Sequence, residues 1–95
     1  MTEFDIKFRA HAIQRMFERS VSEKDIHQSI CEGEIIKEYP QDNPYPSKLI
    51  LAWIDDRPLH VVVADDQEDG VKIVVTVYEP DPEIWTSDFK RRKQS

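Results

Sequence analysis

Two valine-rich stretches in the second half of the chain predict neighbouring β-strands, and each carries side chains that can do chemistry. The first reads Arg57-Pro58-Leu59-His60-Val61-Val62-Val63-Ala64, and the second contains Val74-Val75-Thr76-Val77-Tyr78. β-Branched residues at this density favour strands over helices. A histidine inside such a strand needs a hydrogen-bonding partner once it is buried, so His60 requires a specific explanation.

The alternation along these strands predicts which side chains share a face. One apolar face of the first strand is formed by Leu59, Val61 and Val63, and one face of the second by Val71, Ile73, Val75 and Val77. Pairing these faces buries both of them, whereas a slip of one residue would bury Lys72 and Thr76 instead. We therefore expect His60, Thr76 and Tyr78 to lie together on the opposite face.

The first third of the chain predicts two helices. Apolar residues at helical spacing indicate a helix from Ala10 to about Arg19, with its buried stripe formed by Ala10, Ile13, Met16 and Phe17. Ser22 and Asp25 have the spacing of a capping box that starts a second helix, and Gly33 is expected as its left-handed C-cap. The short connection between the helices favours a tight αα-hairpin.

The remainder predicts strands over Glu34–Tyr39, Lys48–Ile54, Leu59–Ala64 and Val71–Glu79, joined by short connections that favour an antiparallel meander. Asp81 and Pro82 resemble the start of a short C-terminal helix that Trp85 and Phe89 would dock. The expected fold is α+β, a single domain over residues 1–95. It consists of two N-terminal helices packed on a four-stranded antiparallel β-meander, followed by that short helix.

Composition narrows the function classes. The 95 residues include 13 Lys and Arg against 19 Asp and Glu, a net charge of −6, which argues against wrapping nucleic acid by bulk electrostatics. The C-terminal tail Lys90-Arg91-Arg92-Lys93 is nevertheless wholly basic. Cys31 is the single cysteine, so no internal disulfide forms and a reducing compartment is indicated. We see no signal peptide or membrane segment and expect a cytoplasmic protein.

Three residues of the first helix, His11, Arg15 and Arg19, are spaced i, i+4, i+8 and therefore share one face. An imidazole beside two guanidinium groups suits phosphate handling, because histidine moves protons near neutral pH and arginine pairs with phosphate through two hydrogen bonds. The alternative interpretation is the ordinary charged face of an amphipathic helix, which the spacing alone favours.

His60 also has two interpretations, a functional imidazole or a core imidazole satisfied by a neighbouring hydroxyl such as that of Thr76 or Tyr78. Tyr78 could equally be a packing residue, as aromatic side chains in strands usually are. His27 and Cys31 are spaced i, i+4, but two ligands without a third do not indicate a metal site. No cofactor motif is visible, since only Gly33 and Gly70 are available for a phosphate loop.

Four motifs, in this order along the chain, carry a resemblance to a known family. They are His11-Ala12-x-x-Arg15-Met16-x-x-Arg19, Gly33-Glu34-Ile35-Ile36-x-Glu38-Tyr39, Arg57-Pro58-Leu59-His60-Val61-Val62 and Thr76-Val77-Tyr78-x-Pro80-Asp81-Pro82-x-x-Trp85. Over about residues 8–89 the chain resembles the bacterial family catalogued as domain of unknown function 4258, leaving a basic tail at 90–95. Members of that family are similar to RelE-like and BrnT-like toxins, which are small α+β proteins.

The resemblance implies one half of a toxin–antitoxin pair, with a small zinc-finger or helix-turn-helix protein as antitoxin. The implied activity is metal-independent RNA cleavage, in which the ribose 2′-hydroxyl attacks the adjacent phosphate. By the resemblance, His60 and His11 would be acid and base, and Arg15 and Arg19 would hold the phosphate. Thr76 and Tyr78 would supply orienting or proton-donating hydroxyls.

Two alternatives remain beside cleavage. A non-catalytic binding module on the same RelE-like scaffold would hold a partner peptide or small anion in the cleft. The acidic balance favours it, because a protein partner with a basic patch would be steered to the chain. RelE-type toxins are usually basic, and this chain is acidic. The second alternative is a relic of the toxin fold, in which the polar cluster has only a structural role. Homo-oligomerisation stays open, because a free edge strand in a short sheet invites pairing.

Overall fold

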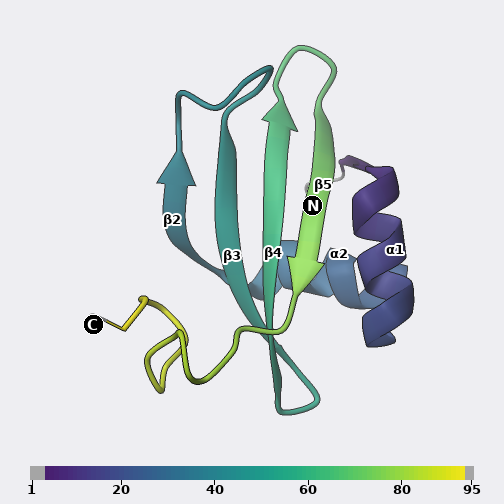
Figure 1. Ribbon diagram of the computed structural model, residues 1–95. Helices are drawn as coiled ribbons and strands as arrows, with labels where there is room; N and C mark the ends of the chain where they lie inside the picture. The colour runs from purple at the N-terminus through teal and green to yellow at the C-terminus, as the bar shows by residue number, and fades with distance from the viewer. Residues whose placement is uncertain (1–3, 94–95) are drawn as a thin grey trace.

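The computed structural model of the protein describes residues 4–93, and its centre is a mixed β-sheet of five strands (Figure 1). The elements follow one another as β1 (Asp5–Phe8), α1 (Ala10–Arg19), α2 (Glu23–Glu32), β2 (Glu34–Tyr39), β3 (Ser47–Ile54), β4 (Arg57–Asp66) and β5 (Val71–Tyr78). The strand order across the sheet is β1-β5-β4-β3-β2.

The α+β class is confirmed, but the predicted arrangement of two N-terminal helices on four antiparallel strands is wrong. A strand precedes the helices: β1 pairs in parallel with β5, with Asp5 opposite Val71 and Phe8 opposite Val74. Along the chain, the two helices therefore come between β1 and β2. From β2 to β5 the sheet is the expected antiparallel meander. The turn between β3 and β4 consists of Asp55 and Asp56, both at positive φ, as two-residue hairpins require.

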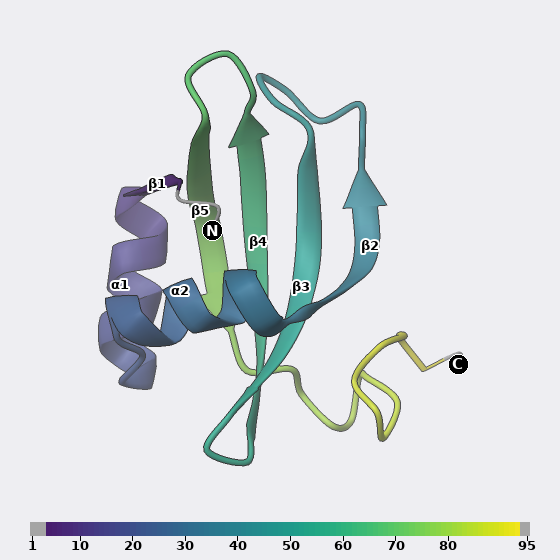
Figure 2. The same cartoon turned by 180° about the vertical axis from the view of Figure 1, so that it is seen from behind.

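The two helices do not form an αα-hairpin either. Figures 1 and 2 show α1 beside β5 at the edge of the sheet, whereas α2 runs behind the sheet across β4 and β3. Each helix is thus oriented by the strands that it covers. Both pack on one face of the sheet, called the helical face below. Its core consists of Ala12, Met16, Val21, Ile26, Ile50, Ile54, Leu59, Val61, Val63, Val74 and Val77.

The buried stripe of α1 differs from the one predicted. Ala12 and Met16 are buried, but Ile13 is 55% exposed and Phe17 is 89% exposed. A helix at the edge of a sheet contacts it along a narrow strip, so only the part of the apolar surface that turns toward β5 is covered. In α2 the predicted capping box is present, with Ser22 Oγ accepting from Asp25 N at 3.0 Å and Asp25 Oδ2 accepting from Ser22 N at 3.1 Å.

Gly33 ends α2 in extended backbone, at φ −72 and ψ 166, so the predicted left-handed C-cap is wrong. A Cβ at this position would collide with the Ile50 side chain and the Ser29 carbonyl oxygen. The glycine is needed because the chain passes directly from α2 into β2 close against β3, and no larger residue fits.

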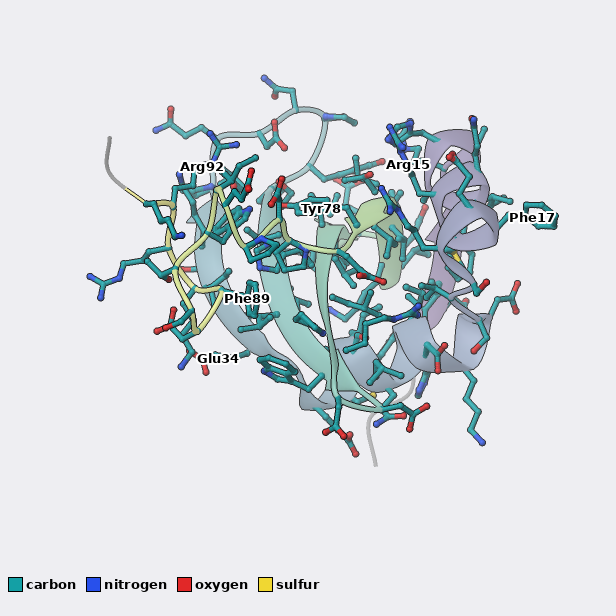
Figure 3. The ribbon with its side chains drawn as sticks, turned by 60° about the horizontal axis from the view of Figure 1, so that its bottom comes forward. Arg15, Phe17, Glu34, Tyr78, Phe89 and Arg92 are labelled. Carbon is teal, nitrogen blue, oxygen red and sulfur yellow. The ribbon has the colours of Figure 1, made fainter. Side chains whose placement is uncertain are left out.

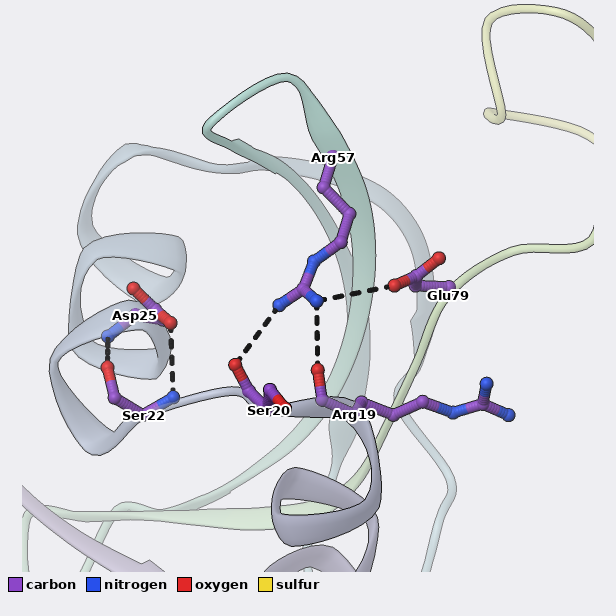
Figure 4. A network of polar contacts seen from close by, with 6 residues as sticks. All are labelled: Arg19, Ser20, Ser22, Asp25, Arg57 and Glu79. Carbon is purple, nitrogen blue, oxygen red and sulfur yellow. Dashed lines mark hydrogen bonds and ion pairs between the residues drawn. The ribbon is translucent and has the colours of Figure 1, made fainter.

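One arginine connects the start of β4 to both helix α1 and the end of β5 (Figure 4). Arg57 Nη1 donates to the Arg19 carbonyl oxygen at 2.8 Å and lies 3.4 Å from Glu79 Oε1. Nη2 reaches the Ser20 carbonyl oxygen at 3.5 Å. Arg57 therefore satisfies carbonyl groups that the end of α1 leaves without helical partners.

A β-bulge corrects the predicted register of β5. Val61 pairs with Val77 and Val62 with Thr76, which agrees with the predicted faces, but Val63 then pairs with Val74, so Val75 has no partner. Beyond this bulge the faces of β5 are exchanged. Val74 enters the core in place of Val75, and Ile73 lies opposite Ala64 on the other side of the sheet. Apolar residues on both sides of β5 made this irregularity invisible to alternation alone.

The segment after β5 is not helical within the described residues, so the predicted C-terminal helix is wrong. A turn at Asp81 is followed by a narrow loop in which Trp85 forms an isolated antiparallel bridge with Arg92. Backbone hydrogen bonds from Thr86 N to Arg91 O and from Lys93 N to Ile84 O, both 2.8 Å, close this loop. We call residues 79–93 the C-terminal segment; it crosses the sheet on the side away from α2 (Figures 1 and 2).

Candidate nucleic-acid interface

His60 is completely buried between the sheet and the C-terminal segment. Its Nε2 lies 2.8 Å from the Phe89 carbonyl oxygen and its Nδ1 lies 3.1 Å from the Tyr78 hydroxyl. Because a carbonyl oxygen only accepts, Nε2 carries the proton and Nδ1 accepts from Tyr78. Burial lowers the pKa of His60, and the hydrogen bond to Phe89 opposes that shift. The imidazole is therefore neutral and has both nitrogens occupied.

Aromatic contacts hold the C-terminal segment on this histidine. The Trp85 ring packs edge-on against His60 at 4.4 Å between centroids, and Tyr78 does so at 5.1 Å. Phe89 packs against Trp53 of β3 at 5.8 Å, and Lys90 pairs with Glu34 of β2 at 3.1 Å. Figure 3 shows Tyr78, Phe89 and Arg92 grouped where the segment crosses the sheet. His60 thus joins the segment to the sheet.

The segment and the sheet enclose a cleft of about 430 Å³ on the face opposite the helices. We call it the basic groove. Its lining is supplied by β2, β3, β5 and the C-terminal segment, and comprises Ile36, Lys37, Tyr39, Leu49, Tyr78, Trp85, Lys90, Arg91 and Arg92. Four of these side chains are cationic and three are aromatic, and no carboxylate lines the groove among the residues that the structure describes. This is the composition expected of a surface that binds nucleic-acid backbone and bases.

A second β-bulge brings β2 into this groove. Ile35 pairs with Ile50 and Lys37 with Leu49, so Ile36 is unpaired and both Ile36 and Lys37 line the groove. Lys37 Nζ lies 5.5 Å from the centroid of the Tyr39 ring, and the Arg92 guanidinium lies 5.8 Å from that of Trp85. Bulges re-aim side chains in this way beside functional sites.

The charges of the groove are only partly neutralised by protein groups. Hydrogen bonds from Thr86 and from the Lys90 backbone lower the pKa of Asp88, and the nearby charges of Lys90 and Arg91 add to this. Lys90 is paired with Glu34, but among the described residues no ion pair involves Lys37, Arg91 or Arg92. Burial raises the pKa of Tyr78, and Tyr39 adds to this while the Arg92 charge opposes it. Tyr78 therefore remains a neutral hydroxyl at physiological pH, in a cleft that attracts anions.

The structure brings together some of the predicted site residues and separates others. Tyr78 lies directly opposite His60, and Thr76 lies opposite Val62 on the same face, which is the face that the alternation predicted for all three. Tyr78 lines the basic groove, whereas His60 lies buried beneath the C-terminal segment. The shared location of His60, Thr76 and Tyr78 on one face is confirmed, and their catalytic roles stay predictions.

The helical residues of the predicted site lie elsewhere. His11 lines a separate hollow between α1 and the β2–β3 loop, Arg15 is 3.8 Å from Glu18, and the side chain of Arg19 is exposed. None of the three lines the basic groove. Their roles as base and phosphate clamps also remain predictions.

Sequence reasoning missed most of the groove. Lys37 and Tyr39 alternate along β2, which was a signal that they share a face, and the basic run Lys90–Lys93 was visible. No local pattern predicts that these two regions meet. Within residues 4–93, no group of three or more His, Cys, Asp and Glu side chains is placed to hold a metal ion. Neither α1 nor α2 has the length and apolar character needed to cross a bilayer.

Comparison with known proteins gives one result. A family model described as domain of unknown function (DUF4258) matches residues 8–79, which include β5 but end before most of the C-terminal segment. No curated protein and no solved structure shows a significant match to the chain. Because the family model covers most of the sequence, the chain belongs to the DUF4258 family.

Proposed function

We propose that the protein binds single-stranded RNA in the basic groove. The observation that carries this proposal is the concentration of Lys37, Arg91 and Arg92 around Tyr39 and Tyr78, in a chain whose net charge is −6. An acidic protein repels phosphate over most of its surface. Affinity for an RNA backbone is therefore confined to the place where cations gather.

The chemistry of the lining favours an unpaired strand over a duplex. Side chains of tyrosine and tryptophan bind bases by stacking, which requires bases that are splayed out of a helix. The groove offers Tyr39, Tyr78 and Trp85 for this contact, beside cations that can face the phosphates. The expected cytoplasmic location and the RNA substrate of the toxins that the family resembles agree with this ligand.

Fluorescence anisotropy with a labelled single-stranded RNA tests the proposal. Lys37→Glu and Arg91→Glu reverse charges in the groove, and each should weaken binding at least tenfold at low salt. The salt dependence should become shallower by about 0.7 in log–log slope for each phosphate that the variant no longer neutralises. Lys24→Glu is the matched control, because Lys24 is exposed on α2 and makes the same change of net charge.

Equal weakening by Lys37→Glu and Lys24→Glu would show that only net charge matters and would refute a groove-specific site. The same oligonucleotide as DNA measures the contribution of the 2′-hydroxyl. Double-stranded RNA should bind more weakly than the single strand if stacking on the groove tyrosines contributes.

Cleavage of the bound RNA is a second candidate function, favoured by the position of Tyr78. Its neutral hydroxyl lines the groove and is held by His60 Nδ1 at 3.1 Å. In transesterification the 2′-hydroxyl loses its proton, the 2′-oxygen forms a bond to phosphorus, the bond from phosphorus to the 5′-oxygen breaks, and the 5′-oxygen takes a proton. Because the Tyr78 hydroxyl donates to His60 Nδ1, Tyr78 would accept the proton of the 2′-hydroxyl while passing its own proton to His60, and a water molecule would protonate the 5′-oxygen. His60, fully buried, would act through Tyr78 rather than touch RNA.

This second function would make the chain a toxin that an antitoxin neutralises, and growth tests it directly. Expression without a neighbouring gene should arrest growth, and Tyr78→Phe at equal soluble level should restore it. The same variant should still bind RNA, because the ring remains. If arrest persists with Tyr78→Phe, the hydroxyl has no catalytic role.

A further inference from the structure

A second hollow lies on the same side of the sheet as the basic groove. It has a volume of about 320 Å³ between the start of α1 and the β2–β3 loop. We call it the helix-side hollow, and its lining comprises Arg9, His11, Asp42, Asn43, Pro44, Tyr45, Ala64 and Val75. The proposed function uses none of these residues.

Strand register shows how near the two depressions are. Tyr39 of the groove pairs with Ser47, and Ser47 pairs with Ala64 of the hollow. These three residues form one cross-strand row and point to the same face. Two inter-strand spacings separate Tyr39 from Ala64, which is about 10 Å. Neither α1 nor α2 crosses this face between them (Figure 1), and the buried Ser47 is covered from the side of the β2–β3 loop, where its hydroxyl donates to Asp42.

The floor and rim of the hollow have different chemistry. Pro44, Ala64 and the bulge residue Val75 make an apolar floor beside the Tyr45 ring. The nearby Asp66 carboxylate raises the pKa of Tyr45 most, and burial and the charges of Asp69 and Glu68 add to this, so the ring stays neutral beside an acidic stretch of the β4–β5 turn. Arg9 and His11 supply donors at the rim. Asp42 is the single carboxylate among the described lining residues, and its Oδ2 accepts from Ser47 Oγ at 2.7 Å.

We propose that a single RNA strand bound in the basic groove continues across the open face and places a base in the helix-side hollow. The base packs on the Tyr45 ring, and Arg9 and His11 face the adjoining phosphate. Stacking on an aromatic ring and pairing with a guanidinium group are the contacts that single strands use on protein surfaces. This inference rests on the proposed function, and it predicts a minimum length for the RNA that fills the whole site.

The length of the RNA probe distinguishes binding in the basic groove alone from binding in both subsites. The 10 Å between them corresponds to at most about three nucleotides, because a base-stacked strand advances about 3.4 Å per nucleotide and a strand with splayed bases advances further. A dinucleotide fills the basic groove alone, and a hexanucleotide reaches both. We expect the hexanucleotide to bind the wild-type protein at least tenfold more tightly than the dinucleotide.

Two variants probe the hollow without touching the groove. Arg9→Ala removes an exposed side chain that makes no capping hydrogen bond, and Tyr45→Leu keeps an apolar side chain but removes the ring. Each should weaken hexanucleotide binding by about tenfold, in line with the loss of one stacked base. Binding of the dinucleotide should not change. Lys24→Ala is the exposed control, and circular dichroism verifies that each variant is folded.

The outcomes are distinct. Loss of hexanucleotide affinity with unchanged dinucleotide affinity supports the two-subsite site. Equal binding of both probes to the wild type, or no effect of Arg9→Ala on the hexanucleotide, overturns the continuation into the hollow and leaves groove binding intact. If neither probe binds the wild-type protein, the proposed function fails and this inference fails with it.

Discussion

The two faces of the sheet differ in how they are covered and in what each contributes. The helical face is closed by α1 and α2 over a core of apolar side chains, and the buried Ser29 of α2 has its hydroxyl satisfied within its own helix by the Asp25 carbonyl oxygen. The opposite face is covered in part by the irregular C-terminal segment, which rests on a buried histidine, aromatic rings and an ion pair. The first face provides stability, and the second provides both depressions that we assign to RNA.

The contrast between the two faces explains why a polar residue, His60, is buried on one face of a small sheet. On the helical face, apolar burial is non-directional and any well-packed side chain serves. On the open face, an irregular segment needs directional contacts, because it has no ladder or helix to hold it. His60 supplies two such contacts at once, to Phe89 and to Tyr78.

Truncation on the helical face should produce the largest loss of stability. Leu59 is completely buried in the core, so Leu59→Ala should lower the free energy of unfolding by about 3 kcal/mol. Urea denaturation followed by circular dichroism measures the change. Val62→Ala, on the open face of the same strand, is the matched control and should cost much less. Equal costs would mean that the open face is as tightly packed as the helical one.

Replacing His60 should release the C-terminal segment from the sheet and lower the stability of the whole protein less than truncation in the core does. His60→Ala leaves the Phe89 carbonyl and the Tyr78 hydroxyl without partners and removes the contact with Trp85. We expect a loss of about 2 kcal/mol in the free energy of unfolding. Limited trypsin digestion should then cut first at the basic residues of the C-terminal segment. If Leu59→Ala exposes that segment equally, His60 is not its specific anchor.

Acid should weaken the attachment of the segment before it affects the core. The pKa of His60 is lowered in the folded protein, so the unfolded chain binds more protons as the pH falls through about 6.5. The free energy of unfolding should therefore decrease from neutral pH toward the lowered pKa of the folded state. His60→Gln should abolish this part of the pH dependence, as measured by urea denaturation at several pH values. An unchanged profile in the variant would assign the effect to other groups.

The smallest effect is expected on the outer side of α1. Phe17 is 89% exposed and points away from the sheet (Figure 3), so Phe17→Ser should change the free energy of unfolding by no more than about 0.5 kcal/mol. Met16→Ala, one residue away and buried, should cost several times more. A large cost for Phe17→Ser in thermal denaturation would show that this side chain is covered in solution.

Much of the meander and part of the site could be predicted because they depend on neighbours in the chain. Alternating apolar residues and short turns define β2 to β5 and their antiparallel pairing. The capping box of α2 involves residues three positions apart. The shared face of His60 and Tyr78 could be predicted from the apolar alternation around them, although the bulge that separates this pair from the hairpin turn could not. These are interactions between residues close in the chain, so the sequence alone is enough to predict them.

The rest depends on contacts between distant parts of the chain. The parallel partner of β5 comes from the N-terminal end, so β1 could not be inferred from a meander. The place of α1 at the sheet edge determined that Met16 is buried and Phe17 is not. The basic groove exists because Lys37 of β2 and Arg92 of the C-terminal segment meet on one face. Local periodicity does not encode such meetings, since packing free energy selects them only when the whole sheet is assembled.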